Sequence, residues 1–187
     1  SFDSVRPELF SKAQKRAVEV GKEYGKAVYY VRRGDPINIG GGIKRMKGEA
    51  FTIPGTDIVF ASHDTKSDFI HHELFHLFLE LNRHREKLLL NEAKFHILAD
   101  SEKFKWYKER AEFYYPQYIN KPDVMNDIIL EEITCDLCEY AMSGSEKMYN
   151  RLNGLFEGDT LETLAEQARE VFEANREAYQ AGKGQKI

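Results

Sequence analysis

Cysteine is scarce in this 187-residue sequence, which contains only Cys135 and Cys138. A disulfide framework therefore cannot support the fold. No stretch approaches the roughly 18 to 20 consecutive apolar residues that a membrane-spanning helix needs. The first ten residues, SFDSVRPELF, lack the apolar core of a signal peptide and also lack methionine. These absences favour a cytoplasmic location, although the compartment and any parent protein stay open.

A strong excess of positive charge is also absent, because the formal net charge is −4. Residues 1–50 contain 11 basic and 6 acidic residues, whereas residues 122–187 contain 6 basic and 14 acidic ones. Nucleic-acid binders usually show a stronger basic bias than this. We therefore expect neither a nucleic-acid nor a membrane partner. With 42% hydrophobic residues, the chain can form one domain over 1–187, complete or cut from a larger protein.

The first third of the chain predicts a helix followed by a small sheet. Apolar residues at helical spacing predict a helix over 8–24, and AVYYVR at 27–32 is typical of a strand. The glycine-rich segment 34–48 predicts a loop. Strands at 49–53 and 58–62 flank the turn sequence PGTD and predict a hairpin.

The remainder of the chain predicts helices. Thr65 and Asp68 match a capping box, which would begin a helix near residue 66. The expected helices cover about 66–85, 88–114, 123–142, 145–154 and 160–180. A helix, a small mostly antiparallel sheet and a helical C-terminal half together predict an α+β fold.

The sequence His72-Glu73-Leu74-Phe75-His76 is an HExxH motif. Residues four apart lie on one face of a helix, so His72 and His76 can bind the same metal ion. Glu73 lies about 100° around the helix, where it can reach a water on that metal without being a ligand. The pattern is typical of zinc hydrolases.

Apolar residues surround this motif and predict a buried helix; they are Phe69, Ile70, Leu74, Phe75, Leu77, Phe78, Leu79 and Leu81. Buried polar side chains are unfavourable unless they are paired or bind a metal. The alternative interpretation is two core histidines satisfied by hydrogen bonds.

Catalytic zinc usually has three protein ligands, so a third must come from elsewhere. The metzincin pattern would need glycine at 79 and histidine at 82, where this chain has Leu79 and Asn82. His84 lies eight residues beyond His76 and is expected to project elsewhere. A better source of carboxylates is the segment Leu130–Asp136 on a predicted helix.

Together, HExxH and the later Glu132-x-x-x-Asp136 resemble the gluzincin (thermolysin-like) metallopeptidases, in a minimal single-domain version. Glu131 would pair with Cys135, which does not fit that pattern. On a helix, Glu132 and Asp136 fall beside Met125, Ile128 and Ile129, whereas Glu131 falls on a side expected to be wetter.

The resemblance implies a zincin-like fold and one Zn²⁺ per chain, bound by His72, His76 and Glu132. Glu73 would be the general base for attack of a metal-bound water on a peptide or protein substrate. Asp136 would accept a hydrogen bond from His72 and orient its ring. The strand 58–62 would lie at the edge of the cleft and pair with the substrate backbone. The expected protein is thus a zinc metallopeptidase.

Other interpretations remain open at this point. Cys135-x-x-Cys138 is a single pair, so it favours helix packing over a zinc knuckle or redox role. The chain can be a catalytically silent zincin-like binding module of a larger phage or mobile-element protein. It can also be a zinc hydrolase that acts on a non-peptide amide. Substrate, oligomeric state and the residue that stabilises the transition state are not determined by the sequence.

Overall fold

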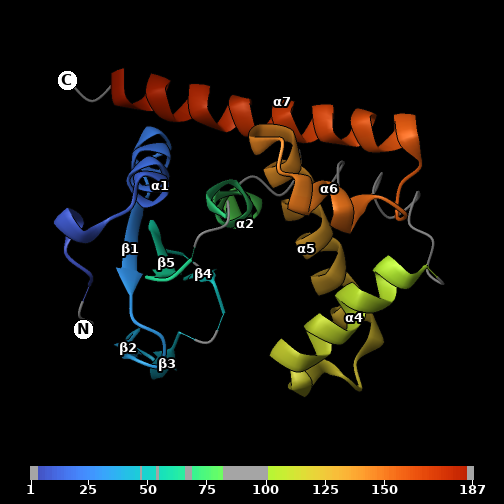
Figure 1. The fold of residues 1–187 in the computed structure, drawn as a ribbon, viewed down its shortest axis with the longest axis horizontal. Coiled ribbons are helices and arrows are strands. Elements are labelled where there is room, and N and C mark those ends of the chain that lie inside the picture. The colour runs from blue at the N-terminus through green and yellow to red at the C-terminus, as the bar shows by residue number, and fades with distance from the viewer. Residues whose placement is uncertain (1–3, 47, 54, 66–68, 82–100, 185–187) are drawn as a thin grey trace. The chain divides into compact units, whose positions relative to one another are not determined.

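A computed structural model describes residues 4–46, 48–53, 55–65, 69–81 and 101–184. The chain divides into two compact units, Ser1–Leu81 with Ala174–Ile187 and Asn82–Glu173, and each is described by itself. Helices and a small sheet are both present (Figure 1), which confirms the predicted α+β class. The finer predictions, a zincin-like fold and one domain over 1–187, stay predictions.

The first unit begins with α1 (Lys12–Glu23), shorter than the predicted helix over 8–24. Residues Pro7–Leu9 form a separate 3₁₀ turn, and Ser11 caps α1 in a capping box with Gln14. This reciprocal pair satisfies backbone groups at the helix start, so the helix begins after Ser11.

A three-stranded sheet follows, with strand order β1-β5-β4 (Figure 1). β1 (Ala27–Val31) pairs in parallel with β5 (Ile58–Ser62), and β4 (Ala50–Thr52) pairs antiparallel with β5. The predicted β4–β5 hairpin is confirmed. The expected pairing of strand 58–62 with a substrate backbone is wrong, because β5 is already paired with β1 and β4; β4 is the edge strand beside it.

The segment predicted to be a loop contains a second hairpin, β2 (Pro36–Asn38) and β3 (Ile43–Arg45). Gly40 and Gly42 have φ angles of 85° and 153° in its turn, and the Asn38 side chain accepts a hydrogen bond from the Gly40 amide. Such positive angles favour glycine, which explains the glycine-rich turn. The strands are short, so their periodicity gave no signal in the sequence.

The two faces of the sheet bury alternate residues, as period-two strands require. Val31 and Phe60 pack with Ile37 of β2 and with Met46 on one face. On the opposite face, Tyr30 of β1 lies edge-on to Phe69, at the start of α2, with ring centroids 6.3 Å apart.

α2 (Ile70–Leu81) packs on α1 and on β4. The described part confirms the core of the helix predicted over 66–85. The capping-box residue Asp68 and the predicted end beyond residue 81 lie outside the described residues. Tyr24 at the end of α1 contacts Phe78 of α2, with ring centroids 5.5 Å apart.

The second unit is helical, as predicted. Its elements are α4 (Glu102–Tyr114), η2 (Pro116–Tyr118), α5 (Pro122–Ser143), α6 (Glu146–Leu152) and the first part of α7 (Gly158–Gly184). The α7 residues from Ala174 onward belong to the first unit. The part of the helix expected at 88–100 lies outside the described residues. Within the described ranges, no helix is both long and apolar enough to cross a membrane.

Candidate metal centre

The HExxH histidines lie side by side on α2. The Nε2 atoms of His72 and His76 are 3.1 Å apart, and their ring centroids are 4.8 Å apart. Both side chains are half-buried. The four-residue spacing on one helix therefore brings the two imidazole nitrogens together, as the sequence predicted.

This separation suits two ligands of one zinc ion. Zinc–nitrogen bonds of about 2.0–2.1 Å at a tetrahedral angle would place two ligand nitrogens about 3.3 Å apart. A hydrogen bond between the rings gives a similar distance, so 3.1 Å fits both interpretations. The donor types and their spacing are compatible with zinc.

Glu73 is the buried carboxylate of the motif, with only 8% of its surface exposed. Its negative charge acts on Lys44 of β3: burial lowers the pKa of Lys44, and Glu73 raises it against that effect. The Lys44 ammonium lies 4.2 Å from the centroid of the Phe51 ring on β4. The hairpin therefore supplies a cation within electrostatic reach of Glu73, which no sequence spacing indicated.

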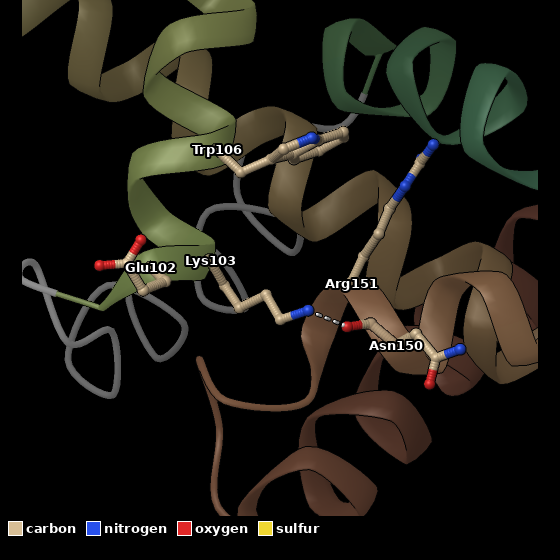
Figure 2. A pocket seen from close by; sticks show the side chains of 5 residues that line it. All are labelled: Glu102, Lys103, Trp106, Asn150 and Arg151. Carbon is tan, nitrogen blue, oxygen red and sulfur yellow. Dashed lines mark hydrogen bonds between the residues drawn. The ribbon is translucent and has the colours of Figure 1, made fainter.

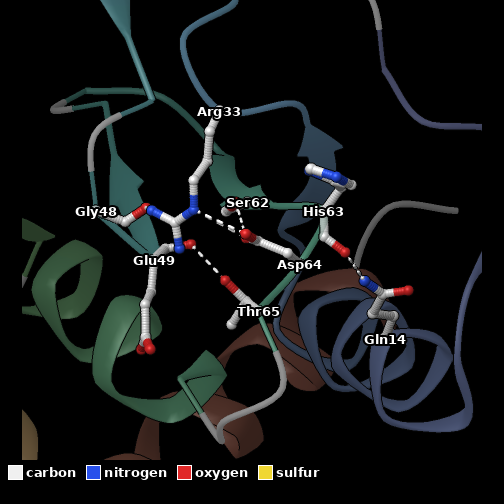
Figure 3. A network of polar contacts seen from close by, with 8 residues as sticks. All are labelled: Gln14, Arg33, Gly48, Glu49, Ser62, His63, Asp64 and Thr65. Carbon is white, nitrogen blue, oxygen red and sulfur yellow. Dashed lines mark hydrogen bonds and ion pairs between the residues drawn. The ribbon is translucent and has the colours of Figure 1, made fainter.

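A polar network holds the chain that enters α2 (Figure 3). Arg33 donates from Nε to both carboxylate oxygens of Asp64, at 3.0 and 2.9 Å, and Ser62 donates to the same carboxylate. The Thr65 hydroxyl donates to the Glu49 carbonyl at 3.1 Å. These bonds join the end of β1, the start of β4 and the segment after β5.

The same segment is also held from α1. Gln14, which is buried, donates from its side-chain amide to the carbonyl of His63 at 2.7 Å (Figure 3). The amide of His63 donates to the Val31 carbonyl at 2.9 Å. The backbone at His63, seven residues before the first residue of α2, is thus tied to both α1 and β1.

The other predicted site residues lie on α5 in the second unit. Glu132 is half-buried, and Asp136, one helical turn later, is 3% exposed. Cys135 lies between them and is fully buried. The expectation of a wetter side next to Glu131 is wrong, because Thr134 and Cys138 are also fully buried. This part of α5 is buried on all sides. Helical periodicity alone does not show which sides other elements cover.

Asp136 has partners from two other helices. The Tyr107 hydroxyl of α4 donates to Oδ2 of Asp136 at 2.5 Å, and Nη1 of Arg151 on α6 lies 3.9 Å from that oxygen. Tyr107 and Arg151 were not identified from the sequence, because they are far from Asp136 along the chain and belong to no local motif.

The cysteines are free thiols and both are buried. Burial raises the pKa of Cys138 well above its usual range, and the charge of Glu139 adds to this effect. A neutral thiol is a poor nucleophile, so the CxxC pair supports the packing interpretation for Cys138.

The structure thus brings His72, Glu73 and His76 together in the first unit, and Glu132 and Asp136 in the second. The joining of these two halves in one site stays a prediction, and His84 lies outside the described residues. No protein family, curated protein sequence or solved structure matches this chain.

Proposed function

We propose that this protein is a zinc metallopeptidase, with His72, His76 and Glu132 as the ligands of one Zn²⁺ ion. The main support is the convergence of two Nε2 atoms, 3.1 Å apart, beside a buried glutamate on α2. A bound zinc ion would supply Lewis-acid activation of water and of the substrate carbonyl.

Glu73 would act as the general base, taking a proton from the attacking water and returning it to the leaving amine. Its place directly after His72 on α2 supports this role, because the carboxylate can reach a water on a metal ion held by His72 and His76. Asp136 would hold the zinc-binding ring of His72 through a hydrogen bond.

An extended peptide would bind along β4, the edge strand of the sheet. β4 packs against α2, which carries the HExxH motif. Strand addition supplies backbone hydrogen bonds to a peptide of any sequence. This assignment replaces the strand 58–62, whose two edges are already paired.

The zinc content of purified protein tests the ligand set. We expect about one zinc per chain in the wild type and a clear loss in His76→Ala and Glu132→Ala. Glu131→Ala and His71→Ala are matched controls, because each removes a neighbouring side chain of the same type and should leave zinc in place. Normal zinc content in Glu132→Ala would show that the third ligand is another group, for which Cys135→Ser is the next variant.

Cleavage of a peptide library tests the chemistry. Glu73→Gln should keep zinc and lose about 10²-fold or more of the cleavage rate, because a general base is missing. Cleavage by Glu73→Gln at the wild-type rate would refute the mechanism. A zinc-loaded wild type that cleaves no peptide would favour a binding module, and cleavage of small amides alone would favour a non-peptide substrate.

A further inference from the structure

A buried cluster in the second unit surrounds the carboxylate of Asp136. Asp136 and Tyr107 are each 3% exposed, and the Tyr107 hydroxyl donates to Oδ2 at 2.5 Å. The Arg151 guanidinium lies 3.9 Å from the same oxygen. Burying a carboxylate is unfavourable unless hydrogen bonds and opposite charge compensate. Tyr107 of α4 provides a hydrogen bond, and Arg151 of α6 provides a positive charge.

Tyr107 acts as a hydrogen-bond donor throughout the physiological pH range. Burial raises its pKa well above the usual range, and the negative charge of Asp136 raises it further. Glu132 also raises the pKa of Tyr107, by a smaller effect. The Tyr107 hydroxyl therefore lies in the electrostatic field of both acidic residues that we assign to the metal centre.

Arg151 is itself held in place by an aromatic ring. Its guanidinium carbon lies 4.9 Å from the centroid of the Trp106 ring, and that ring meets Tyr107 edge-on at 5.0 Å. Trp106 and Arg151 line a pocket of about 310 Å³. In the same pocket, Lys103 donates a hydrogen bond to the Asn150 carbonyl at 2.7 Å (Figure 2). This bond ties α4 to the residue of α6 that precedes Arg151.

We propose that Tyr107 and Arg151 are positioning residues for the metal centre, which together fix the orientation of the Asp136 carboxylate. This inference rests on the proposed function, in which Asp136 orients the zinc ligand His72. Tyr107 restricts the direction of one carboxylate oxygen, and Arg151 balances its charge. A fixed carboxylate orients a histidine better than a mobile one, because less rotational freedom is lost when zinc binds.

The test is the zinc dissociation constant, measured by competition with a chromogenic chelator. Tyr107→Phe removes one oxygen and should weaken zinc binding by about tenfold, the lower end for an outer partner of a metal ligand. Asp136→Asn should weaken it at least as much. The double variant should bind zinc no more weakly than Asp136→Asn alone, because the hydroxyl acts through that carboxylate.

Tyr140→Phe is the matched control. The Tyr140 hydroxyl also donates to a carboxylate, Oε1 of Glu162, at 2.7 Å, but at an exposed position. Its loss should leave the zinc dissociation constant unchanged. If Tyr107 had only a structural role, Tyr107→Phe would lower the melting temperature of the zinc-free protein without changing the zinc dissociation constant.

The outcomes separate this inference from the proposed function. If the wild type binds no zinc, both are refuted. If the wild type binds zinc and Glu132→Ala does not, but Tyr107→Phe binds like the wild type, the positioning role alone is refuted. Should Tyr107→Phe fail to fold, Arg151→Gln provides the second test: weaker zinc binding supports the inference, and unchanged binding refutes it.

Discussion

Glu73 and Lys44 show how a residue acquires properties from a distant part of the chain. Glu73 is part of a helical motif, whereas Lys44 comes from the β2–β3 hairpin. The charge of Glu73 raises the pKa of Lys44, against the larger lowering by burial.

Glu73→Gln should therefore lower the pKa of Lys44 further, because the opposing negative charge is removed. The measurement is an NMR titration of the ¹³Cε signal of Lys44 in both proteins. Glu102→Gln is the control, because Glu102 forms an exposed ion pair with Lys105. This variant should leave the pKa of Lys44 unchanged. An unchanged pKa of Lys44 in Glu73→Gln would show that the two charges do not interact.

At the scale of elements, the residues at the end of β5 and directly after it, Ser62–Thr65, are held by side-chain hydrogen bonds. Arg33, Asp64 and Ser62 form the central contacts (Figure 3). Hydrogen bonds from Arg33 lower the pKa of Asp64 to about 2, and the Ser62 hydroxyl contributes to the same effect. This network ties the residues directly after β5 to the segment after β1.

Asp64→Asn should destabilise the protein at neutral pH but not at strongly acidic pH. Because the folded pKa of Asp64 lies below its unfolded value, its contribution is complete above about pH 4 and disappears as the pH falls toward 2. Urea unfolding of both proteins across this range measures the difference. The pair is partly exposed, so the difference should be small and should shrink in high salt. A difference that persisted at pH 2 would contradict this assignment.

At the scale of the chain, the C-terminal segment returns to the beginning of the fold. In the first unit, Tyr179 of α7 packs against Gly25, which connects α1 to β1 with a φ of 72°. Nη2 of Arg176 lies 3.8 Å from Oε2 of Glu23. A Cβ atom at Gly25 would lie 2.3 Å from Cε2 of Tyr179, which is too close for a van der Waals contact.

Gly25→Ala should lower the free energy of unfolding by about 2 kcal/mol or more, from backbone strain and from overpacking against Tyr179. Gly34→Ala is the matched control, because Gly34 has a φ of 82° and no atom within 4 Å of the added Cβ. It should lose only about 1 kcal/mol. Equal losses in the two variants, measured by urea unfolding, would show that contact with Tyr179 is unimportant.

Local patterns in the sequence determined much of this structure. The four-residue spacing of His72 and His76 places their nitrogens together wherever the helix lies, because helical geometry alone fixes that relation. β-Branched and aromatic residues likewise predicted β1, the PGTD turn predicted the hairpin that ends in β5, and helical spacing predicted α5 and α6. Each of these features depends on residues close together in the chain.

Tertiary structure decided which elements became neighbours. β5 is the central strand because β1 pairs with it along the whole length of β5. Each residue of β1 precedes its partner in β5 by 31 positions in the sequence. The hydrogen bond from Tyr107 to Asp136 spans 29 residues, and Lys44 reaches Glu73 from a separate hairpin. Such contacts form only when elements that are distant in the sequence pack against one another. Spacing in one element therefore determined the candidate ligands, and packing between elements determined their surroundings.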